Sequence, residues 1–475
     1  MGYPIWNRRR FLKTAAGTAG FLAAMPCLNA AEVFTDTKPL KVGLVGCGGR
    51  GLGAMKNALD ADPGTMVWAL ADVFQERIDF GAKLLAEQYG NRAQLDRSRL
   101  FSGLDSYKRL LQTDIDVVLL CTPPAFRPEH LAAAIDASKH IYAEKPVAVD
   151  VPGVLSVLES ARLAKLKNLV ILDGFCWRYD KANEEAHRKL SSGLLGRVLS
   201  FDGLYYTTPP KSPLALDSRP SSDTDVAWAL RNWTAWNWLS GGQFVEQIVH
   251  TIDGMVWSMN EQLPLAAFGS GGRAQRRDDG DVWDHYDVYF EYDHNVTAHI
   301  SCRQWVGCHG EIVDRTICEK GMLVTPYRPY IQANNRWRFR GERGNMYADT
   351  HVAFYRFLRS GTWTQTLESA ANKTLAAIMG REAAHTGQRI TWEQIKKSTA
   401  RLMPDGLTEV PALSLYGSWP TSFHPIPTSA FTGLPPWLRS LPHSYWEEYI
   451  MLISVFRSMN PCSPSAFPTN FTPEI

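Results

Sequence analysis

Three ionisable side chains, Lys145, Glu246 and His250, are of the types that move protons and stabilise negative charge. Glu246 and His250 are four residues apart on a segment whose apolar positions suit one buried helix face. Side chains at that spacing share a helix face, so we expect the carboxylate to orient or charge-stabilise the imidazole. The ordinary pKa of histidine suits a general base, and the Lys145 ammonium can stabilise an alkoxide. Together these residues predict a site that takes the proton from a hydroxyl group.

The elements that must position Lys145 are short apolar runs alternating with helical segments. The runs at 115–120, 140–143 and 169–172 are typical of strands, and the stretches between them are helical in pattern. Alternating strands and helices imply a parallel, doubly wound sheet whose ligand site lies at the carboxyl ends of its strands. Lys145 follows the run at 140–143, so it is predicted to lie at that edge.

An earlier strand-like run at 40–45 leads directly into a glycine-rich turn and then a helical stretch. Gly46 permits the tight turn, Gly48 lets the backbone approach a pyrophosphate, and Gly51 lets helix and strand pack closely. The next apolar run ends in Asp72, about twenty residues further on, where an acid accepts hydrogen bonds from ribose hydroxyls and repels a 2′-phosphate. The pattern predicts a dinucleotide site that favours NAD over NADP.

With Glu144-Lys145-Pro146 added, the chain resembles the glucose-fructose oxidoreductase and inositol dehydrogenase (Gfo/Idh/MocA) family. The resemblance runs in patches from about Lys41 to about Leu402 and rests on the order and spacing of Gly46–Gly51, Cys121–Pro124, Glu144–Pro146 and Gly241–Asp253. It implies an α/β protein with an N-terminal Rossmann domain and a C-terminal α/β domain. The second domain would carry a mostly antiparallel open sheet that supports the substrate site and often oligomer contacts. The resemblance also implies a cis bond before Pro146.

The same resemblance implies roles for individual residues. It places the cofactor against the glycine loop, Asp72 and the loops after later strands, through Gly46, Gly48, Gly49, Arg50, Gly51, Asp72, Thr122, Pro123, Glu144 and Lys145. It makes Lys145, His250 and Glu246 catalytic, although the family usually has Asp where this chain has the longer Glu246. Asp253 is either a polar partner or part of an exposed face, and the exposed face is favoured.

A second domain is predicted at 176–345, where alternating runs indicate strands of a mostly antiparallel sheet. A tryptophan-rich segment precedes Glu246, and flat indoles beside amide and guanidinium donors suit a carbohydrate. The predicted substrate contacts are Arg178, Tyr179, Arg231, Trp233 and Trp236. The alternative is that these tryptophans fill the interface between the domains.

Residues 1–31 resemble a twin-arginine signal peptide, with the paired arginines at 8–9, a weakly apolar run at 14–25 and a small-residue cleavage site at 28–30. They predict export to the periplasm by the twin-arginine translocase, which moves folded proteins with their cofactor bound. Residues 1–30 carry four basic residues and no acid, so their removal changes the net charge from +2 to −2. Such a chain has no basic field with which to hold nucleic acid.

The remaining boundaries are a Rossmann domain at 38–175, returning helices at 346–402 and an irregular tail at 403–475. The tail holds 12 of the 28 prolines and is given no function. The eight cysteines match neither a disulfide framework nor a zinc pattern and are interpreted as small buried apolar residues.

These features predict an exported, NAD-dependent oxidoreductase that acts on a sugar, sugar derivative or polyol, as a homo-oligomer with a tightly bound cofactor. One alternative is a glycosidase that uses NAD catalytically through oxidation, elimination and reduction. The other is a nucleotide-binding sensor or scaffold without catalysis. Net NADH formation distinguishes the first from the second, because the glycosidase returns its hydride.

Overall fold

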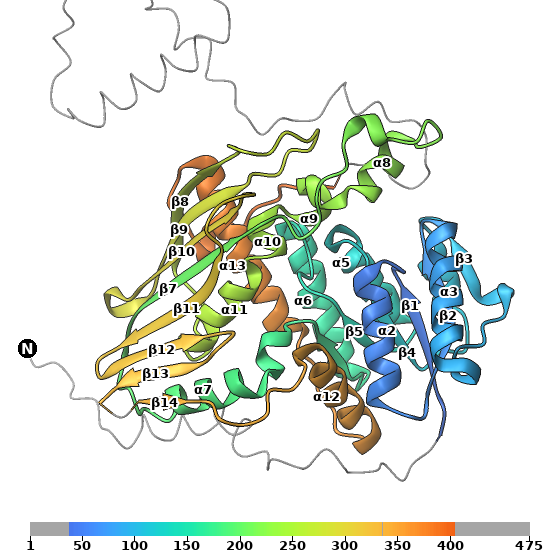
Figure 1. Ribbon diagram of the computed structural model, residues 1–475, viewed down its shortest axis with the longest axis horizontal. Coiled ribbons are helices and arrows are strands. Elements are labelled where there is room, and N and C mark those ends of the chain that lie inside the picture. Colours follow the sequence, from blue (N-terminus) through green and yellow to red (C-terminus); the bar gives the residue numbers. More distant parts are fainter. Residues whose placement is uncertain (1–37, 335, 404–475) are drawn as a thin grey trace, which may run out of the picture. The chain divides into compact units, whose positions relative to one another are not determined.

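The computed structural model describes residues 38–334 and 336–403 (Figure 1). The predicted signal peptide and the tail from residue 404 onward lie outside these residues. Within this part of the chain, no helix combines the length and the apolar character needed to cross a membrane.

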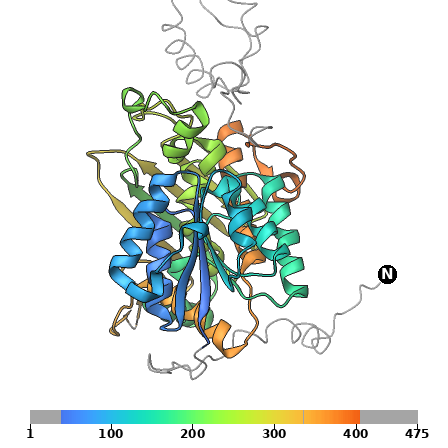
Figure 2. The same cartoon turned by 90° about the vertical axis from the view of Figure 1, so that its right-hand side faces the viewer.

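The first domain is a six-stranded parallel sheet with the strand order β3-β2-β1-β4-β5-β6, the order expected of a Rossmann domain. Its strands are β1 (Leu40–Val45), β2 (Thr65–Asp72), β3 (Leu100–Ser102), β4 (Val117–Leu120), β5 (His140–Ala143) and β6 (Ile171–Asp173). Helices cover both faces, which is why β4 is apolar and buried along its whole length. In Figure 2 the strands lie between the two helix layers.

One helix layer consists of α2 (Gly49–Ala61), α3 (Gln75–Tyr89) and α12 (Met346–Ser360), which share one buried cluster. The other consists of α4 (Ser106–Leu111), α5 (Arg127–Asp136) and α6 (Val151–Leu166). Helix α6 begins where the Asp150 side chain caps the Gly153 amide at 2.9 Å, and Pro152 occupies its first turn.

The second domain is built on a nine-stranded sheet with the order β14-β13-β12-β11-β7-β10-β9-β8-β15. Only the central β7–β10 pair is parallel, so the predicted, mostly antiparallel sheet is confirmed. The strands are β7 (Val198–Thr207), β8 (Ala266–Gly272), β9 (His285–Glu291), β10 (Thr297–Gln304), β11 (Glu311–Cys318), β12 (Gly321–Thr325), β13 (Tyr330–Ala333), β14 (Trp337–Arg338) and β15 (Ile390–Thr391). The other helices of the described chain are α7 (Lys181–Ser191), α8 (Asp225–Arg231), α9 (Asn237–Ser240), α10 (Gln243–Glu246), α11 (Val249–Ser258), α13 (Leu367–Thr386) and α14 (Trp392–Ile395).

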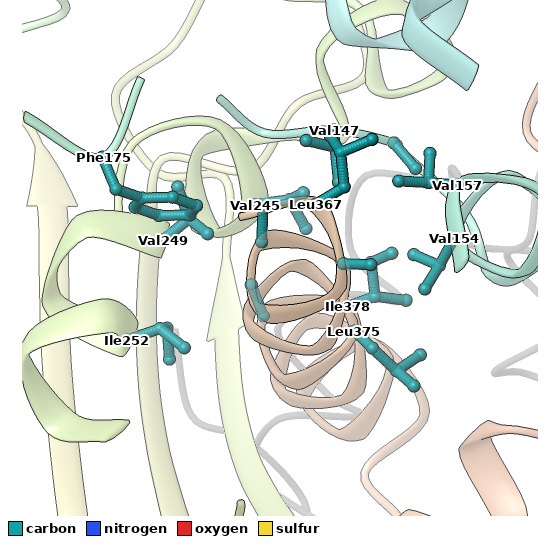
Figure 3. Close-up of a cluster of buried hydrophobic side chains, with 14 of the residues drawn as sticks. Val147, Val154, Val157, Phe175, Val245, Val249, Ile252, Leu367, Leu375 and Ile378 are labelled. Atoms are coloured by element: carbon teal, nitrogen blue, oxygen red, sulfur yellow. The ribbon is translucent and has the colours of Figure 1, made fainter. Parts of the chain in front are cut away.

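Helix α13 joins the two domains. It contacts α6 of the first domain on one side and α10, α11, β8 and β9 of the second domain on the other. Figure 3 shows this core, with Val154 and Val157 on α6, Ile378 on α13 and Val249 on α11. The segment 241–253, which carries the predicted residues Glu246 and His250, therefore rests on a single apolar core shared by both domains.

The sequence predicts a single helix around residues 245–256, and this prediction is wrong. The chain forms the short α10, is interrupted at Gln247 and Ile248, and restarts as α11. The interruption removes the regular spacing on which a shared face for Glu246 and His250 depended. Among the described cysteines, Cys308 is exposed and Cys121 is half-buried, whereas the other four are buried as expected.

Candidate active site

The glycine loop between β1 and α2 has the geometry that its sequence predicts. Gly46 has φ of +97°, and a β-carbon there would lie 2.8 Å from the backbone of Cys121. A β-carbon on Gly51 would lie 1.8 Å from the carbonyl oxygen of Gly46. By contrast, the corresponding positions at Gly48 and Gly49 meet nothing within 4 Å, so the backbone is open where a pyrophosphate would approach the first turn of α2.

This loop forms one wall of an open cleft, whose space of about 830 Å³ includes its solvent-filled mouth. The cleft brings together most of the predicted cofactor contacts: Gly46, Gly48, Gly49, Arg50, Gly51, Asp72, Thr122 and Pro123. The Asp72 carboxylate accepts hydrogen bonds from the Cys47 amide at 2.7 Å and the Phe74 amide at 3.0 Å. The acid therefore also holds the glycine loop against the end of β2.

A buried arginine fixes the loops at the carboxyl edge of the sheet. Arg127 is 1% exposed and donates to the carbonyl oxygens of Leu120 at 2.6 Å, Thr122 at 2.7 Å and Pro146 at 3.3 Å. The carbonyls belong to the last residue of β4 and to the loops after β4 and β5, so one side chain ties the predicted cofactor loop to the Lys145 loop. The Lys145–Pro146 peptide is cis, as expected. Sequence reasoning missed Arg127.

Lys145 lies at this edge and pairs with Glu246. Its Nζ donates to the Glu246 carbonyl oxygen at 2.5 Å and to Oε1 of the same residue at 3.1 Å. The Lys145 side chain is 12% exposed and that of Glu246 is 18% exposed, so the pair is partly shielded from water. The nearby Glu144 carboxylate forms an ion pair with Arg50 at 2.9 Å, which places these two predicted cofactor residues together.

His250 lies beside this pair but does not contact Glu246 as predicted. The imidazole stacks on the Trp177 indole, with ring centroids 5.0 Å apart, and meets the Phe175 ring edge-on at 6.1 Å. No hydrogen bond joins Glu246 and His250 in the described chain, because the carboxylate is turned to Lys145. Burial, together with the Lys145 ammonium, holds the pKa of His250 well below its usual value, so the imidazole is neutral at physiological pH.

The expectation of an exposed Asp253 is wrong. Asp253 is 1% exposed, and its Oδ1 accepts from the Arg178 Nε and the Lys373 Nζ, each at 2.8 Å. Burial alone would raise the pKa of Asp253, but these two cations lower it below its usual range. Asp253 follows His250 by almost one helical turn, Arg178 follows Trp177, and Lys373 lies 4.4 Å from the centre of the Phe175 ring. The carboxylate thus ties together the segments that flank the imidazole.

Arg178, a predicted substrate contact, is also bonded to Glu261 at 2.6 Å and serves this ion-pair network, and its contact with a substrate stays a prediction. Tyr179 packs partly buried against the core of the Rossmann domain.

The predicted substrate residues Arg231 and Trp233 lie at the nucleotide cleft instead. Trp233 lines that cleft, and the Arg231 guanidinium lies 4.0 Å from the centre of the Phe74 ring. Arg231 also pairs with Glu76 of α3 at 2.7 Å, so the segment around α8 reaches across to the first domain. Trp236 is partly buried, and its indole nitrogen has no partner among the described residues. Both interpretations of these indoles, sugar contact and packing between the domains, stay predictions.

Aromatic side chains that the sequence did not single out surround His250 instead. Trp177 stacks on Tyr205, with centroids 6.3 Å apart, and meets Tyr327 edge-on at 5.9 Å. Tyr347 lies over the Arg50 guanidinium at 4.8 Å. Tyr327 and Tyr347 are 42% and 39% exposed, so their rings remain accessible beside the catalytic cluster. The residues come from four distant segments, and no local signal in the sequence could have grouped them.

The cleft fits a dinucleotide. Its open side lies over Gly48 and Gly49, and the buried Nη2 atom of Arg50 has no hydrogen-bond partner in the described part of the chain. The glycine loop would hold the pyrophosphate, and Arg50, Glu144 and Lys145 would lie towards the nicotinamide. Bound there, the nicotinamide supplies a hydride acceptor or donor.

Comparison with known proteins agrees with this architecture. Residues 40–171 match a family described as the oxidoreductase family with an NAD-binding Rossmann fold, and residues 183–347 match the GFO/IDH/MocA C-terminal domain. The curated relatives include dTDP-3,4-didehydro-2,6-dideoxy-alpha-D-glucose 3-reductase of Actinomadura kijaniata, 28% identical over 177 residues, which are 37% of this chain and 48% of the relative. Alpha-N-acetylgalactosaminidase of Shewanella oneidensis is 25% identical over 218 residues, or 42% and 46% of the two chains. The chain spans about half the length of the curated relatives it matches.

Solved structures share the fold over both domains. Levoglucosan dehydrogenase in complex with NADH and levoglucosan has a TM-score of 0.58 at 20% identity, covering 74% of this chain and 99% of its own. The aldose-aldose oxidoreductase of Caulobacter crescentus has a TM-score of 0.59 at 17% identity, with 74% and 99% covered. The two matched domains, the strand orders and the glycine loop together show that this chain belongs to the Gfo/Idh/MocA family of oxidoreductases, with its NAD-binding Rossmann fold.

Proposed function

We propose that this protein transfers hydride between a tightly bound NAD and a hydroxylated carbon of a sugar, sugar derivative or polyol. The observation that carries the proposal is the cluster of Lys145, Glu246 and His250 at the carboxyl edge of the sheet, beside loops that line the nucleotide cleft. Exposed aromatic rings next to this cluster suit the apolar face of a sugar. The structurally similar levoglucosan dehydrogenase, solved with NADH and levoglucosan, supports the same substrate class.

Each residue of the cluster has a separate task in this reaction. The neutral His250 accepts the hydroxyl proton as the C–H bond gives up its hydride, so that the alcohol becomes a carbonyl. The Lys145 ammonium stabilises the negative charge that develops on the oxygen. Glu246 holds the ammonium at that position through its carboxylate and its carbonyl oxygen. The Trp177 indole stacks on the imidazole and so supports its position.

NAD is the proposed cofactor, in preference to NADP. Both Asp72 oxygens accept hydrogen bonds from backbone amides of the cleft wall, so the acid is fixed where it would repel a 2′-phosphate. Arg77 lies 3.9 Å from the same carboxylate and offers some compensation for such a phosphate. Comparing the affinities of the nucleotide-free protein for NAD and NADP tests this part of the proposal.

The main experiment identifies the nucleotide and the reaction together. Mass spectrometry of the nucleotide released from denatured, purified protein should find NAD. The holoprotein should then be screened against sugars and polyols for the near-ultraviolet absorbance of NADH. A sugar-dependent rise is the expected result. Release of NAD by the protein combined with no absorbance change and no product with any sugar would favour the sensor or scaffold.

A glycosidase is the second candidate, because several relatives are named glycosyl hydrolase family 109 proteins and one is named alpha-N-acetylgalactosaminidase. The same cluster could oxidise a ring carbon, allow elimination of the glycosidic oxygen and addition of water in its place, and then return the hydride. Chromatography of the reaction with glycosides separates the two candidates. Free sugar that accumulates without net NADH indicates the glycosidase.

Export by the twin-arginine translocase is part of the proposal and rests on the motif at residues 7–13. A double substitution, Arg8→Lys with Arg9→Lys, should keep the protein in the cytoplasm on cell fractionation. Unchanged secretion of this variant would remove the argument for that route.

Homo-oligomer formation is also proposed, through the outer face of the nine-stranded sheet. Tyr289 is 39% exposed and alternates along β9 with the buried Val288 and Phe290, and it stacks on the exposed Phe268 at 5.4 Å. Light scattering on wild type and on Phe268→Glu compares their masses in solution. A monomeric wild type would contradict this part.

A further inference from the structure

A short segment of the second domain lies at the nucleotide cleft of the first. It comprises residues 225–240, that is α8, the 3₁₀ turn η7 (Trp233–Ala235) and α9, and we call it the strap. Figure 1 shows α8 reaching from the second domain towards the first. Leu230 and Trp233 of the strap line the same cleft as the glycine loop and Asp72. The cleft therefore has walls from both domains.

A single arginine joins the strap to the first domain. The Arg231 guanidinium lies 4.0 Å from the centre of the Phe74 ring, and its Nη1 donates to the Glu76 carboxylate of α3 at 2.7 Å. Its Nε donates to Asp223 of the second domain at 2.7 Å, and its carbonyl oxygen accepts from Lys211 at 2.9 Å. Arg231 has one acid in each domain, so its charge is balanced without a phosphate. We call its contacts with Phe74 and Glu76 the latch.

The latch lies at the adenosine half of the cleft. Asp72 ends β2, where an acid accepts hydrogen bonds from the adenosine ribose, and Phe74 and Glu76 follow it closely. Among the described residues, the lining of the cleft includes Phe74 and Arg77 but not Glu76. Arg77 has its own partner, because it lies 3.9 Å from the Asp72 carboxylate. Glu76 therefore holds the strap at the rim of the cleft and does not itself form the surface that receives the nucleotide.

The other end of the strap meets the opposite wall. Strands β2 and β4 flank β1, and α9 contacts the turn η4 (Pro124–Phe126) that follows β4. Phe126 of this turn lines the cleft. The strap thus contacts the loops on both sides of the glycine loop.

Hydrogen bonds fix the strap to its own domain. Trp228 Nε1 donates to Asp279 at 2.8 Å, and the backbone amide of Asn237 donates to Asp281 at 2.6 Å. The strap is therefore held firmly on the side of the second domain. On the side of the first domain the latch is weaker, because the Glu76 side chain is 59% exposed and an exposed ion pair contributes little. Opening is expected at the latch.

We propose that the strap closes the nucleotide cleft, so that NAD enters and leaves only when the latch between Arg231, Phe74 and Glu76 opens. The second domain then retains the cofactor as well as supplying catalytic residues. The inference deepens the proposed function, on which it rests for the NAD site but not for the sugar chemistry.

The test follows the exchange of NADH on the whole protein. Stopped-flow fluorescence records NADH binding to the nucleotide-free protein, and then the displacement of bound NADH by excess NAD. The first experiment gives the association rate constant and the second gives the dissociation rate constant. A strap that must open slows both steps, whereas a simple contact with the nucleotide mainly slows release.

Two variants open the latch from opposite sides. Glu76→Gln breaks the ion pair from the first domain, leaves the strap itself unchanged and should raise both rate constants about threefold. Arg231→Ala removes the ion pair and the ring contact together and should raise both about tenfold. Glu87→Gln is the matched control, because Glu87 also lies on α3 but pairs with Lys83 of the same helix, and it should change neither rate constant.

Unchanged exchange in both latch variants overturns the inference. Faster dissociation alone in Glu76→Gln also overturns it, because Glu76 would then contact the nucleotide directly. The two proposals fail separately. Faster exchange in the latch variants, with no sugar-dependent NADH in the wild type, would uphold the strap and reject the redox reaction. Sugar oxidation by the wild type, with unchanged exchange in the variants, would reject the strap alone.

Discussion

The nucleotide cleft and the catalytic cluster are built in different ways. The pyrophosphate side of the cleft is formed by backbone, with glycines whose missing side chains leave either no room or an open face. Its key residues follow one strand, one turn and the start of one helix. The catalytic cluster is formed by side chains, and Lys145, Trp177 and His250 come from segments that are far apart in the chain.

This difference determines how each region tolerates substitution. In the cleft, a single added methyl group either collides with backbone or occupies the space of the ligand. In the cluster, a buried network of charges holds the reacting side chains, so the loss of one partner leaves another charge unpaired in the interior. We therefore expect substitutions in the cleft to lower NAD affinity. Substitutions in the cluster should instead lower the reaction rate or the free energy of unfolding.

The largest effect is expected for Lys145→Ala, which removes the charge that stabilises the developing alkoxide. We expect kcat/KM to fall by about a thousandfold, or roughly 4 kcal/mol, and NAD affinity to fall far less than that. Steady-state kinetics and calorimetry measure the two quantities, with Lys320→Ala on the surface as the control. An equally large loss of NAD affinity would show that Lys145 belongs to the nucleotide cleft. That result would contradict the separation between the cleft and the cluster.

Asp253→Asn should have the next largest effect, on stability. The buried Lys373 and the partly buried Arg178 lose their shared carboxylate, which we expect to cost about 3 kcal/mol in the free energy of unfolding. Urea denaturation measures this loss. Glu261→Gln is the matched control, because Glu261 also pairs with Arg178 but is 43% exposed, and it should cost less than about 1 kcal/mol. Equal losses in the two variants would mean that burial of the network is unimportant.

Gly46→Ala and Gly48→Ala test the two kinds of glycine in the cleft. At Gly46 an alanine meets the Cys121 backbone at a φ of +97°, so both stability and NAD affinity should fall, each by about 2 kcal/mol. Gly48 has φ of −75° and open space around it, so Gly48→Ala should fold normally and lose NAD affinity only. Calorimetry and urea denaturation on both variants give the comparison. A Gly48→Ala protein that binds NAD as wild type does would place the pyrophosphate elsewhere.

The smallest effect concerns the loss of stability in acid. We attribute it to two buried histidines, one packed in each domain. His351 lies on α12, which packs on the Rossmann sheet, and His187 lies on α7 of the second domain. Burial lowers the pKa of each to about 3. The unfolded chain takes up these protons below about pH 6.5, whereas the folded chain does not, so stability is full above that pH and falls as the pH drops towards 3. At about pH 5.5 each histidine should cost roughly 1.4 kcal/mol.

The measurement is the difference in unfolding free energy between neutral and mildly acidic solution. His351→Phe and His187→Phe should each reduce this difference, whatever they do to stability at neutral pH. Gln332→Leu, at an exposed position without an ionisable group, is the control and should leave the difference unchanged. An unaltered acid dependence in both phenylalanine variants would mean that these imidazoles are not the groups that titrate.

The contrast between the regions also explains what the sequence could predict. Strand, glycine turn and acid follow one another locally, so the cleft and the Rossmann order were predictable from spacing. The positions of Glu246 and His250 were predicted, but not the helix interruption that turns Glu246 to Lys145. Arg231 and Trp233 have the composition of a sugar site, yet they contact the nucleotide cleft, because tertiary packing and not composition places them. The surroundings of Trp177 and Asp253 come from contacts between segments that are far apart in the chain, so the sequence did not predict them.

The central claim is that a cleft whose glycine loop holds the pyrophosphate presents a nicotinamide to the cluster of Lys145, Glu246 and His250. A crystal structure of the protein with NADH tests it most directly. The account predicts a pyrophosphate over Gly48 and Gly49 and a nicotinamide ring whose reactive carbon faces Lys145 and His250. An empty cleft at saturating NADH, or a ring directed away from these two side chains, would contradict it.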